Sequence, residues 1–193
     1  MRSMLTIAVV LAAVPVLSTG PGCGRGGGAY VYVVPERFLP VLPAELHAYQ
    51  GHPVHLSNFA NVASETERDY YFYSADGLVV YEASGTISAF LRDAFAKALA
   101  GLGMPVYVDE PEALDPSIPE LRATIVRMTE GVLHVQIQLR KYARPVYQQE
   151  YRIEAPPPSI REEKALEQSV YHNVNLALTG MLMDQAFQAA FFQ

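Results

Sequence analysis

Three histidines and a glutamate near the end of the first third of the chain are of the types that bind metal ions. Glu45, His47, His52 and His55 lie close together in the sequence, and imidazole and carboxylate groups are common ligands of zinc. Their spacing matches no helical ligand pair of the HExxH type. Pro53 also favours an extended chain among them. We therefore interpret these histidines as surface or loop residues and predict no metal site.

A second group of possible metal ligands lies among prolines further along the chain and is entirely acidic: Asp109, Glu110, Glu112 and Asp115. A calcium loop is tighter and contains a glycine at its turn, so we interpret this group as a solvated acidic loop. The sequence also contains no GxSxG motif and no pairing of cysteine with histidine. The glycine-rich stretch 24–28 follows no predicted strand and opens no predicted helix, as a phosphate loop would. We therefore predict a protein that is not an enzyme and uses no cofactor.

The chain has a single cysteine, Cys23, and it follows an apolar segment. Arg2 precedes a run of 14 largely apolar residues, Met4 to Leu17. A helix needs ~20 apolar residues to span a bilayer core, so this run is short for a permanent anchor. It is typical of the hydrophobic region of a secretory signal peptide. We predict a signal peptide over residues 1–22 and an exported mature protein.

Two routes of processing are open at this signal peptide. A general signal peptidase could cut after Gly20, although Pro21 would then follow the cut and disfavours that route. Alternatively, Cys23 becomes the lipidated first residue of a bacterial lipoprotein, carrying acyl chains such as palmitate. Gly22 fits the residue before a lipidated cysteine, whereas Gly20 and Pro21 depart from the usual pattern. We favour Cys23 as the lipid attachment site, with residues 23–28 as a glycine-rich tether.

Composition excludes some classes of partner. The 193 residues carry a formal net charge of -6 with a pI near 5.3. A nucleic-acid partner would need a basic surface to neutralise phosphates, and docking on anionic lipid would need one too. The chain is 50% hydrophobic and 18% charged, an ordinary globular balance. We predict a single domain over residues 29–193 and no nucleic-acid partner.

Hydrophobic periodicity predicts the elements of this domain. Alternating patterns predict strands over 29–35 and 53–63, and a hairpin that brings 70–73 and 78–84 together across the Asp76-Gly77 turn. An apolar stripe at three- and four-residue spacing predicts a helix that is capped by Ser84 or Thr86 and ends near Gly101. A strand over 104–111 and a β-meander over 119–155 follow.

The last predicted element is a helix that starts at Ser159. Ser159 and Glu162 have the spacing of a capping box, and the apolar stripe extends to Phe192, with a bend expected at Gly180. Two amphipathic helices can cover one face of a sheet. We therefore predict an α+β fold, a two-layer sandwich in which an antiparallel or mixed sheet is covered on one face by two amphipathic helices.

Four consecutive aromatic residues, Tyr70, Tyr71, Phe72 and Tyr73, stand out in the predicted hairpin. In a strand, alternation sends Tyr70 and Phe72 to one face and Tyr71 and Tyr73 to the other. Large groups on both faces fit a strand that is buried on one side and contacts a partner on the other. Tyrosine is favoured at interfaces, so we predict that these four residues bind a protein partner. An ordinary edge strand packed against the N-terminal segment is the alternative.

The order of these features resembles a known group of proteins. An exported lipoprotein with a strand, then "ISAFLRDAFAKALAGLGMPVYV", then "PELRATIVRM" and "VLHVQIQLR", then a long closing helix resembles the ABC-type transport auxiliary lipoproteins. The lipoprotein subunit of the lipopolysaccharide translocon is similar in order. The resemblance covers about Val54 to Ala190 and is one of pattern. It implies a protein that is not an enzyme and that supports a transport or assembly complex at the outer membrane.

Taken together, these features favour a non-catalytic envelope lipoprotein, an accessory or assembly subunit of a transport or envelope complex. Its lipid would anchor it in a membrane, and Gly24 after the cysteine favours the outer membrane, with the domain facing the periplasm. The alternative is an unlipidated periplasmic or secreted binding module for a small apolar ligand. A hydrolytic enzyme is disfavoured, because no nucleophile and base emerge as a pair.

Overall fold

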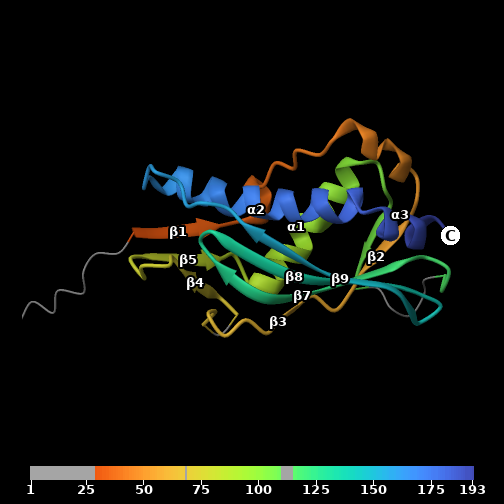
Figure 1. Cartoon of the computed structure of the whole chain (residues 1–193), viewed down its shortest axis with the longest axis horizontal. Helices are drawn as coiled ribbons and strands as arrows, with labels where there is room; N and C mark the ends of the chain where they lie inside the picture. Colours follow the sequence, from red (N-terminus) through yellow and green to blue (C-terminus); the bar gives the residue numbers. More distant parts are fainter. Residues whose placement is uncertain (1–28, 68, 110–114) are drawn as a thin grey trace, which may run out of the picture.

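The computed structural model describes residues 29–67, 69–109 and 115–193 (Figure 1). The predicted signal peptide (1–22), the predicted lipid site Cys23 and the tether (23–28) lie outside the described residues. The same holds for two of the four acidic-loop residues, Glu110 and Glu112, which fall within 110–114.

The first sheet contains three strands in the order β1-β5-β4. β1 (Ala29–Val33) pairs in parallel with β5 (Val79–Ala83), and β4 (Tyr71–Tyr73) pairs antiparallel with β5. The predicted hairpin is therefore confirmed. Gly77 has a φ of +70° at its turn, a conformation that glycine adopts without the strain caused by a Cβ atom.

The second sheet is larger and mixed, in the order β6-β2-β7-β8-β9 with β3 also paired to β7. β7 (Glu120–Thr129), β8 (Val132–Lys141) and β9 (Arg144–Glu154) form the predicted antiparallel meander. β2 (Val54–Leu56) lies parallel to both β7 and β6 (Val106–Val108).

The predicted strand over 53–63 is interrupted. Only β2 and the short β3 (Ala60–Asn61) are extended and paired. Asn58 between them has a φ of 48°, which lies in the left-handed region and breaks the strand. Alternation alone does not reveal this break.

The first long helix, α1 (Ile87–Gly101), agrees with the prediction. Of the two expected caps, Thr86 is the one used: its side chain accepts a hydrogen bond from the Ala89 amide at 3.0 Å. This bond satisfies one of the free amide groups at the helix start. The predicted stripe is buried, and its members within the helix are Ile87, Phe90, Leu91, Ala94, Phe95, Ala98 and Leu99.

The start of the second long helix was predicted wrongly. α2 (Glu163–Met183) begins four residues after Ser159, which is exposed and caps nothing, and Glu162 at the N-cap makes no side-chain capping bond. The preceding segment has tertiary partners instead, because Arg161 pairs with Glu130 at 2.7 Å and with Asp76 at 3.4 Å. These ion pairs hold the residues before α2 outside the helix.

The end of this helix also differs from the prediction. The chain passes Gly180 without ending the helix and breaks at Asp184, and α3 (Gln185–Phe192) follows. The Asp184 carboxylate accepts bonds from the Ala186 amide at 2.7 Å and from the Tyr147 hydroxyl at 2.7 Å. It therefore caps α3 and joins β9 at the same time. Phe187 and Phe191 of α3 are buried and Phe192 is 42% exposed, so this helix mainly covers the core.

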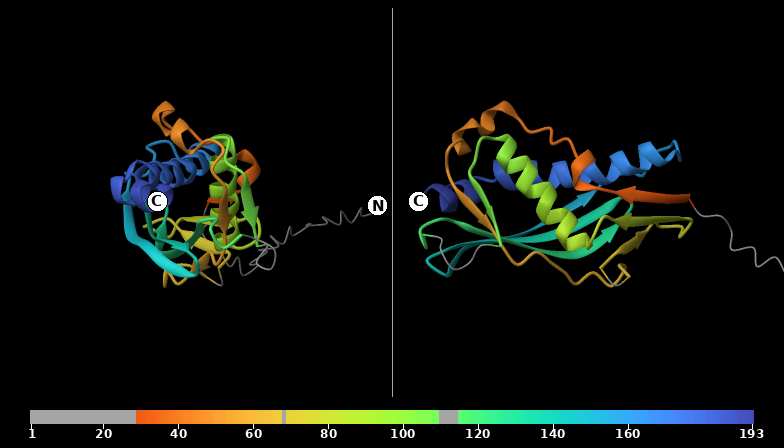
Figure 2. Two further views of the ribbon diagram at one scale, coloured as in Figure 1. Left: turned by 90° about the vertical axis from the view of Figure 1, so that its right-hand side faces the viewer. Right: turned by 180° about the vertical axis from the view of Figure 1, so that it is seen from behind.

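Two short 3-10 segments, η1 (Pro35–Arg37) and η2 (Ala44–Tyr49), connect β1 to β2 across the helical layer (Figure 2). Phe38, Leu46 and Tyr49 from this connection are buried. They extend the hydrophobic core over the helices, because burying apolar area away from water is favourable.

The predicted fold class, α+β with strands packed against helices, is confirmed. α2 packs against β1, β8 and β9, and α1 packs against β3, β5 and β7. The strands divide into two open sheets rather than one, and the buried apolar residues of both sheets and the helices form one cluster. Figure 2 shows α1 and α2 crossing the same side of the long meander strands.

Candidate partner-binding surface

Alternation along two strands of the first sheet separates a buried face from an outer face. In β1, Val31 and Val33 are buried, whereas Tyr30 and Tyr32 are 44% and 48% exposed. In β4, Phe72 is buried, whereas Tyr71 and Tyr73 are only partly covered. The buried members belong to the core, and the tyrosines lie on the opposite face.

The strand register brings these tyrosines together around β5. Val80 lies between Tyr30 and Tyr73, because β5 pairs with β1 on one side and β4 on the other. In the same way, Glu82 lies between Tyr32 and Tyr71. We call this surface, formed by Tyr30, Tyr32, Tyr71, Tyr73, Val80 and Glu82, the tyrosine face.

Hydrogen bonds orient two of the four tyrosines, Tyr30 and Tyr73. The rings of Tyr30 and Tyr32 pack edge to face with centroids 5.2 Å apart, and the Tyr30 hydroxyl donates to the Glu82 carboxylate. The Tyr73 hydroxyl donates to Glu67 at 2.6 Å. This bond to a carboxylate, with a smaller contribution from burial, raises the pKa of Tyr73. The phenol rings are thus held in place while part of their surface stays open to solvent.

Such a surface has features that are typical of protein-binding sites. Tyrosine side chains supply a large contact area and lose little conformational entropy on binding. The hydroxyls of Tyr30 and Tyr73 donate to the carboxylates of Glu82 and Glu67, which limits the motion of these two rings. The tyrosine face therefore has the composition and partial exposure of a protein-binding surface.

Two of the predicted partner-binding residues do not belong to this face. Phe72 is fully buried and stacks on Tyr81 with ring centroids 4.7 Å apart. Its prediction as a partner contact was wrong, because alternation turns it into the core. Tyr70 precedes β4 and is 44% exposed. Its carbonyl accepts the amide of Ala83, so Tyr70 lies at the edge of the sheet rather than within the face.

The contribution of β1 and β5 to the tyrosine face is not evident from the sequence. The sequence predicts Tyr30 and Tyr32 only as members of a strand, and Glu82 only as part of a hairpin. Their period-two spacing was the available signal. This spacing does not reveal that β1 pairs in parallel with β5, because the paired residues lie about fifty positions apart in the sequence.

The histidines and carboxylates whose side chains suit metal binding make other contacts. His52 packs edge to face against Phe192 with centroids 5.1 Å apart, His55 belongs to β2, and His47 is exposed on η2. Asp109 pairs with Arg92, and Asp115 accepts the Ser117 amide at 2.9 Å. Within residues 29–67, 69–109 and 115–193, no three histidine, cysteine, aspartate or glutamate side chains gather closely enough to hold a metal ion.

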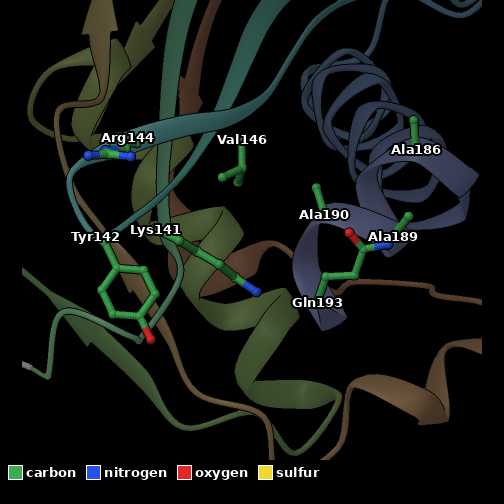
Figure 3. Close-up of a pocket in the computed structure, with 8 residues that line it drawn as sticks. All are labelled: Lys141, Tyr142, Arg144, Val146, Ala186, Ala189, Ala190 and Gln193. Carbon is green, nitrogen blue, oxygen red and sulfur yellow. The ribbon is translucent and has the colours of Figure 1, made fainter.

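An open groove lies at the other end of the domain, between the β8–β9 turn and α3 (Figure 3). It has a volume of about 770 Å³ and is lined by Lys141, Tyr142, Arg144, Val146, Ala186, Ala189, Ala190 and Gln193. The Lys141 ammonium donates to the Phe191 carbonyl at 2.8 Å, and burial lowers the pKa of Lys141. The groove thus combines apolar walls from α3 with basic groups from the hairpin.

Two solved structures have a fold similar to that of this chain. A protein from Xanthomonas campestris described as a DUF330 family member superposes with a TM-score of 0.58 at 10% identity, covering 79% of this chain and 92% of its own. The fold is similar to that of a DUF330 protein. A second structure, described only as an uncharacterized protein, superposes with a TM-score of 0.53 at 11% identity, covering 80% and 97% of the two chains.

These similarities show a shared fold over most of both chains. At such low identity they carry no residue roles. No family model matches the chain, and no curated protein matches it. Among the helices of the described residues, none has the length and apolar character needed to cross a bilayer.

Proposed function

We propose that this protein is a non-catalytic lipoprotein of the bacterial envelope, an accessory or assembly subunit of a transport or envelope complex. In this proposal Cys23 carries acyl chains in the outer membrane, and the domain faces the periplasm. The tyrosine face binds a protein subunit of that complex. The lipid anchors the protein in the membrane, and the domain binds the partner.

The observation that carries this proposal is the position of the tyrosine face. Its four tyrosines lie on β1 and β4, and β1 begins at Ala29, directly after the predicted tether. A tyrosine surface next to a tether has a physical use, because tethering raises the effective concentration of a binding site near its partner. The fold shared with a DUF330 protein is compatible with this role.

Lipidation can be tested on the mature protein. We expect mass spectrometry of the N-terminus to find Cys23 as the first residue with acyl chains, and labelled palmitate to enter the native chain. We expect the Cys23→Ala variant to take up no label and to move from the membrane to the soluble fraction. A native protein that starts elsewhere and carries no fatty acid would contradict the tether.

Partner binding can be tested separately by a photo-crosslinking amino acid placed at Tyr32. We expect an adduct with one defined protein, and we expect Tyr71→Ser to weaken it, because the two residues lie on either side of Glu82. Tyr142 supplies a matched control, since it is 65% exposed and lines the distant groove. Equal crosslinking from positions 32 and 142 would refute the tyrosine face as the binding surface.

The groove beside α3 supports a second candidate function, an unlipidated periplasmic or secreted binding module for a small apolar ligand. Its walls include Val146, Ala186 and Ala190, which could contact a short hydrocarbon. An Ala190→Trp substitution would fill the space. If this function holds, we expect an apolar fluorescent probe to bind the native protein and to lose affinity in the variant, and we expect Cys23 to be unmodified.

A further inference from the structure

The end of the domain at which β1 begins brings together three distant parts of the chain. Ala29 pairs with Val79, which follows Leu78 in the β4–β5 turn. Arg161 pairs with Asp76 of the same turn at 3.4 Å, so the neighbouring Ile160 lies at this end too. Figure 1 shows the start of β1, the β4–β5 turn and the start of α2 together at one end of the long axis, opposite the C-terminus. We call this region the tether end.

The tether end exposes aliphatic side chains. Leu78 is 64% exposed and Ile160 is 58% exposed, although each would be more stable away from water. Tyr30, 44% exposed, starts the tyrosine face beside them. Tyrosine is a residue that settles at membrane–water interfaces, where its ring is buried and its hydroxyl stays wet.

The length of the predicted tether restricts where this end can be. Ala29 lies six positions after Cys23, and six steps of extended chain span at most about 20 Å. If Cys23 is lipidated, as the proposed function states, the tether end must therefore stay within about 20 Å of the head groups. The exposed aliphatic residues lie at the same end as Ala29 and are therefore within reach of the bilayer.

The charges of this end select the type of lipid. The exposed residues Glu162 and Glu163 begin α2, and the exposed Lys164 follows them. Arg161 is already paired with Asp76 and Glu130, so two carboxylates face one remaining cation over residues 161–164. An acidic surface is repelled by anionic lipids and is tolerated by zwitterionic ones. The lipid that suits this end is accordingly a zwitterionic phospholipid.

We propose that the tether end docks on the surface of a zwitterionic bilayer, with Leu78 and Ile160 inserted between the head groups and Tyr30 at the head-group level. This inference rests on the proposed lipidation and adds an orientation to it. Docking holds the groove and the C-terminus away from the membrane and places the tyrosine face next to it. A partner would then be recognised immediately above the lipid surface.

The experiment uses the absence of tryptophan from the chain. A single Leu78→Trp substitution in the full lipidated protein, reconstituted into phosphatidylcholine vesicles with brominated acyl chains, reports contact with lipid. We expect a blue shift of emission and a several-fold loss of intensity from bromine quenching. Val146→Trp, at a position 45% exposed beside the distant groove, is the matched control and should show neither effect. An Ile160→Trp variant measures lipid contact at the tether end independently of position 78.

The outcomes separate this inference from the proposed function. A lipidated, vesicle-bound protein in which position 78 is quenched no more than position 146 overturns docking and leaves the tether intact. A blue shift without bromine quenching means that protein, such as a second copy, covers this end, and it also overturns docking. Absence of acyl chains on Cys23 overturns both proposals. We further expect quenching at position 78 to weaken as anionic phosphatidylglycerol replaces phosphatidylcholine, whereas unchanged or stronger quenching would contradict the role of the acidic residues.

Discussion

Replacing Arg161 with methionine removes the cation that faces a buried carboxylate. Glu130 is only 2% exposed, and its Oε1 accepts from Arg161 at 2.7 Å and from the Tyr81 hydroxyl at 2.9 Å. The same arginine reaches Asp76 at 3.4 Å. Arg161 therefore joins the segment before α2 to both sheets. We expect the Arg161→Met variant to fold but to be less stable.

The size of the loss follows from the burial of the two partners. Removing one member of a fully buried ion pair costs about 3–5 kcal/mol, because the remaining charge is left without compensation. The Arg161 side chain is 44% exposed, so water screens the pair and can partly replace the guanidinium. Tyr81 also remains as a donor to Glu130. We therefore expect a loss of about 2 kcal/mol in the free energy of unfolding.

The assay is urea unfolding followed by circular dichroism, in the soluble Cys23→Ala background, with the midpoint converted to a free energy. A Glu130→Gln substitution removes the buried charge and keeps the shape of the side chain. We expect Glu130→Gln to restore part of the stability lost in Arg161→Met, with a coupling energy of about 1–2 kcal/mol in the double-mutant cycle.

A surface pair provides the control. Arg152 is 67% exposed and pairs with Glu150 at 2.9 Å, so Arg152→Met should change stability by less than about 0.5 kcal/mol. Strictly additive effects of Arg161→Met and Glu130→Gln would refute the reasoning, because they would mean that the arginine does not compensate the buried carboxylate. Equal losses in the Arg161 and Arg152 variants would refute it as well.

Three other substitutions test the backbone and the caps. Ala143 has a φ of 61° in the β8–β9 turn, so Ala143→Gly should raise the free energy of unfolding by about 0.5–1 kcal/mol in urea melts; a loss would contradict strain there. A Cβ on Gly131 would lie 2.5 Å from the Ala155 carbonyl oxygen, so Gly131→Ala should lower the thermal midpoint, at a cost of about 2 kcal/mol, and an unchanged midpoint would show that the turn relaxes freely. The hydrogen bond from the Tyr147 hydroxyl is the main cause that holds the pKa of Asp184 below its usual range. The contribution of this carboxylate is therefore full above the unfolded-state pKa of about 4 and is lost as the pH falls through the lowered folded-state value. Asp184→Ala should lose about 1–2 kcal/mol at neutral pH, and its deficit in urea unfolding should shrink in acid; a deficit independent of pH would exclude the charge as the cause.

The sequence by itself determined the elements whose signals are local. The stripe from Ile87 to Leu99 predicts α1 and its buried side, because side chains three and four residues apart share one face of a helix. Strict alternation in Leu133, Val135, Ile137 and Leu139 predicts β8 and its core face in the same way. The turn at Asp76-Gly77 predicts the β4–β5 hairpin. Each of these patterns is complete within a few residues, so no distant contact is needed to interpret it.

Only the tertiary structure decided which of these elements meet. Parallel strands can pair in many registers that local sequence does not distinguish, and the pairing of β1 with β5 is what gathers Tyr30, Tyr32, Tyr71 and Tyr73 on one face. Asp184 ends α2 because its carboxylate bonds to Tyr147 on β9 as well as to the start of α3. α2 starts only at Glu163 because Arg161, just before it, pairs with residues in two distant turns. In each case the deciding bond joins residues far apart in the chain, and a periodic pattern carries no information about such a bond.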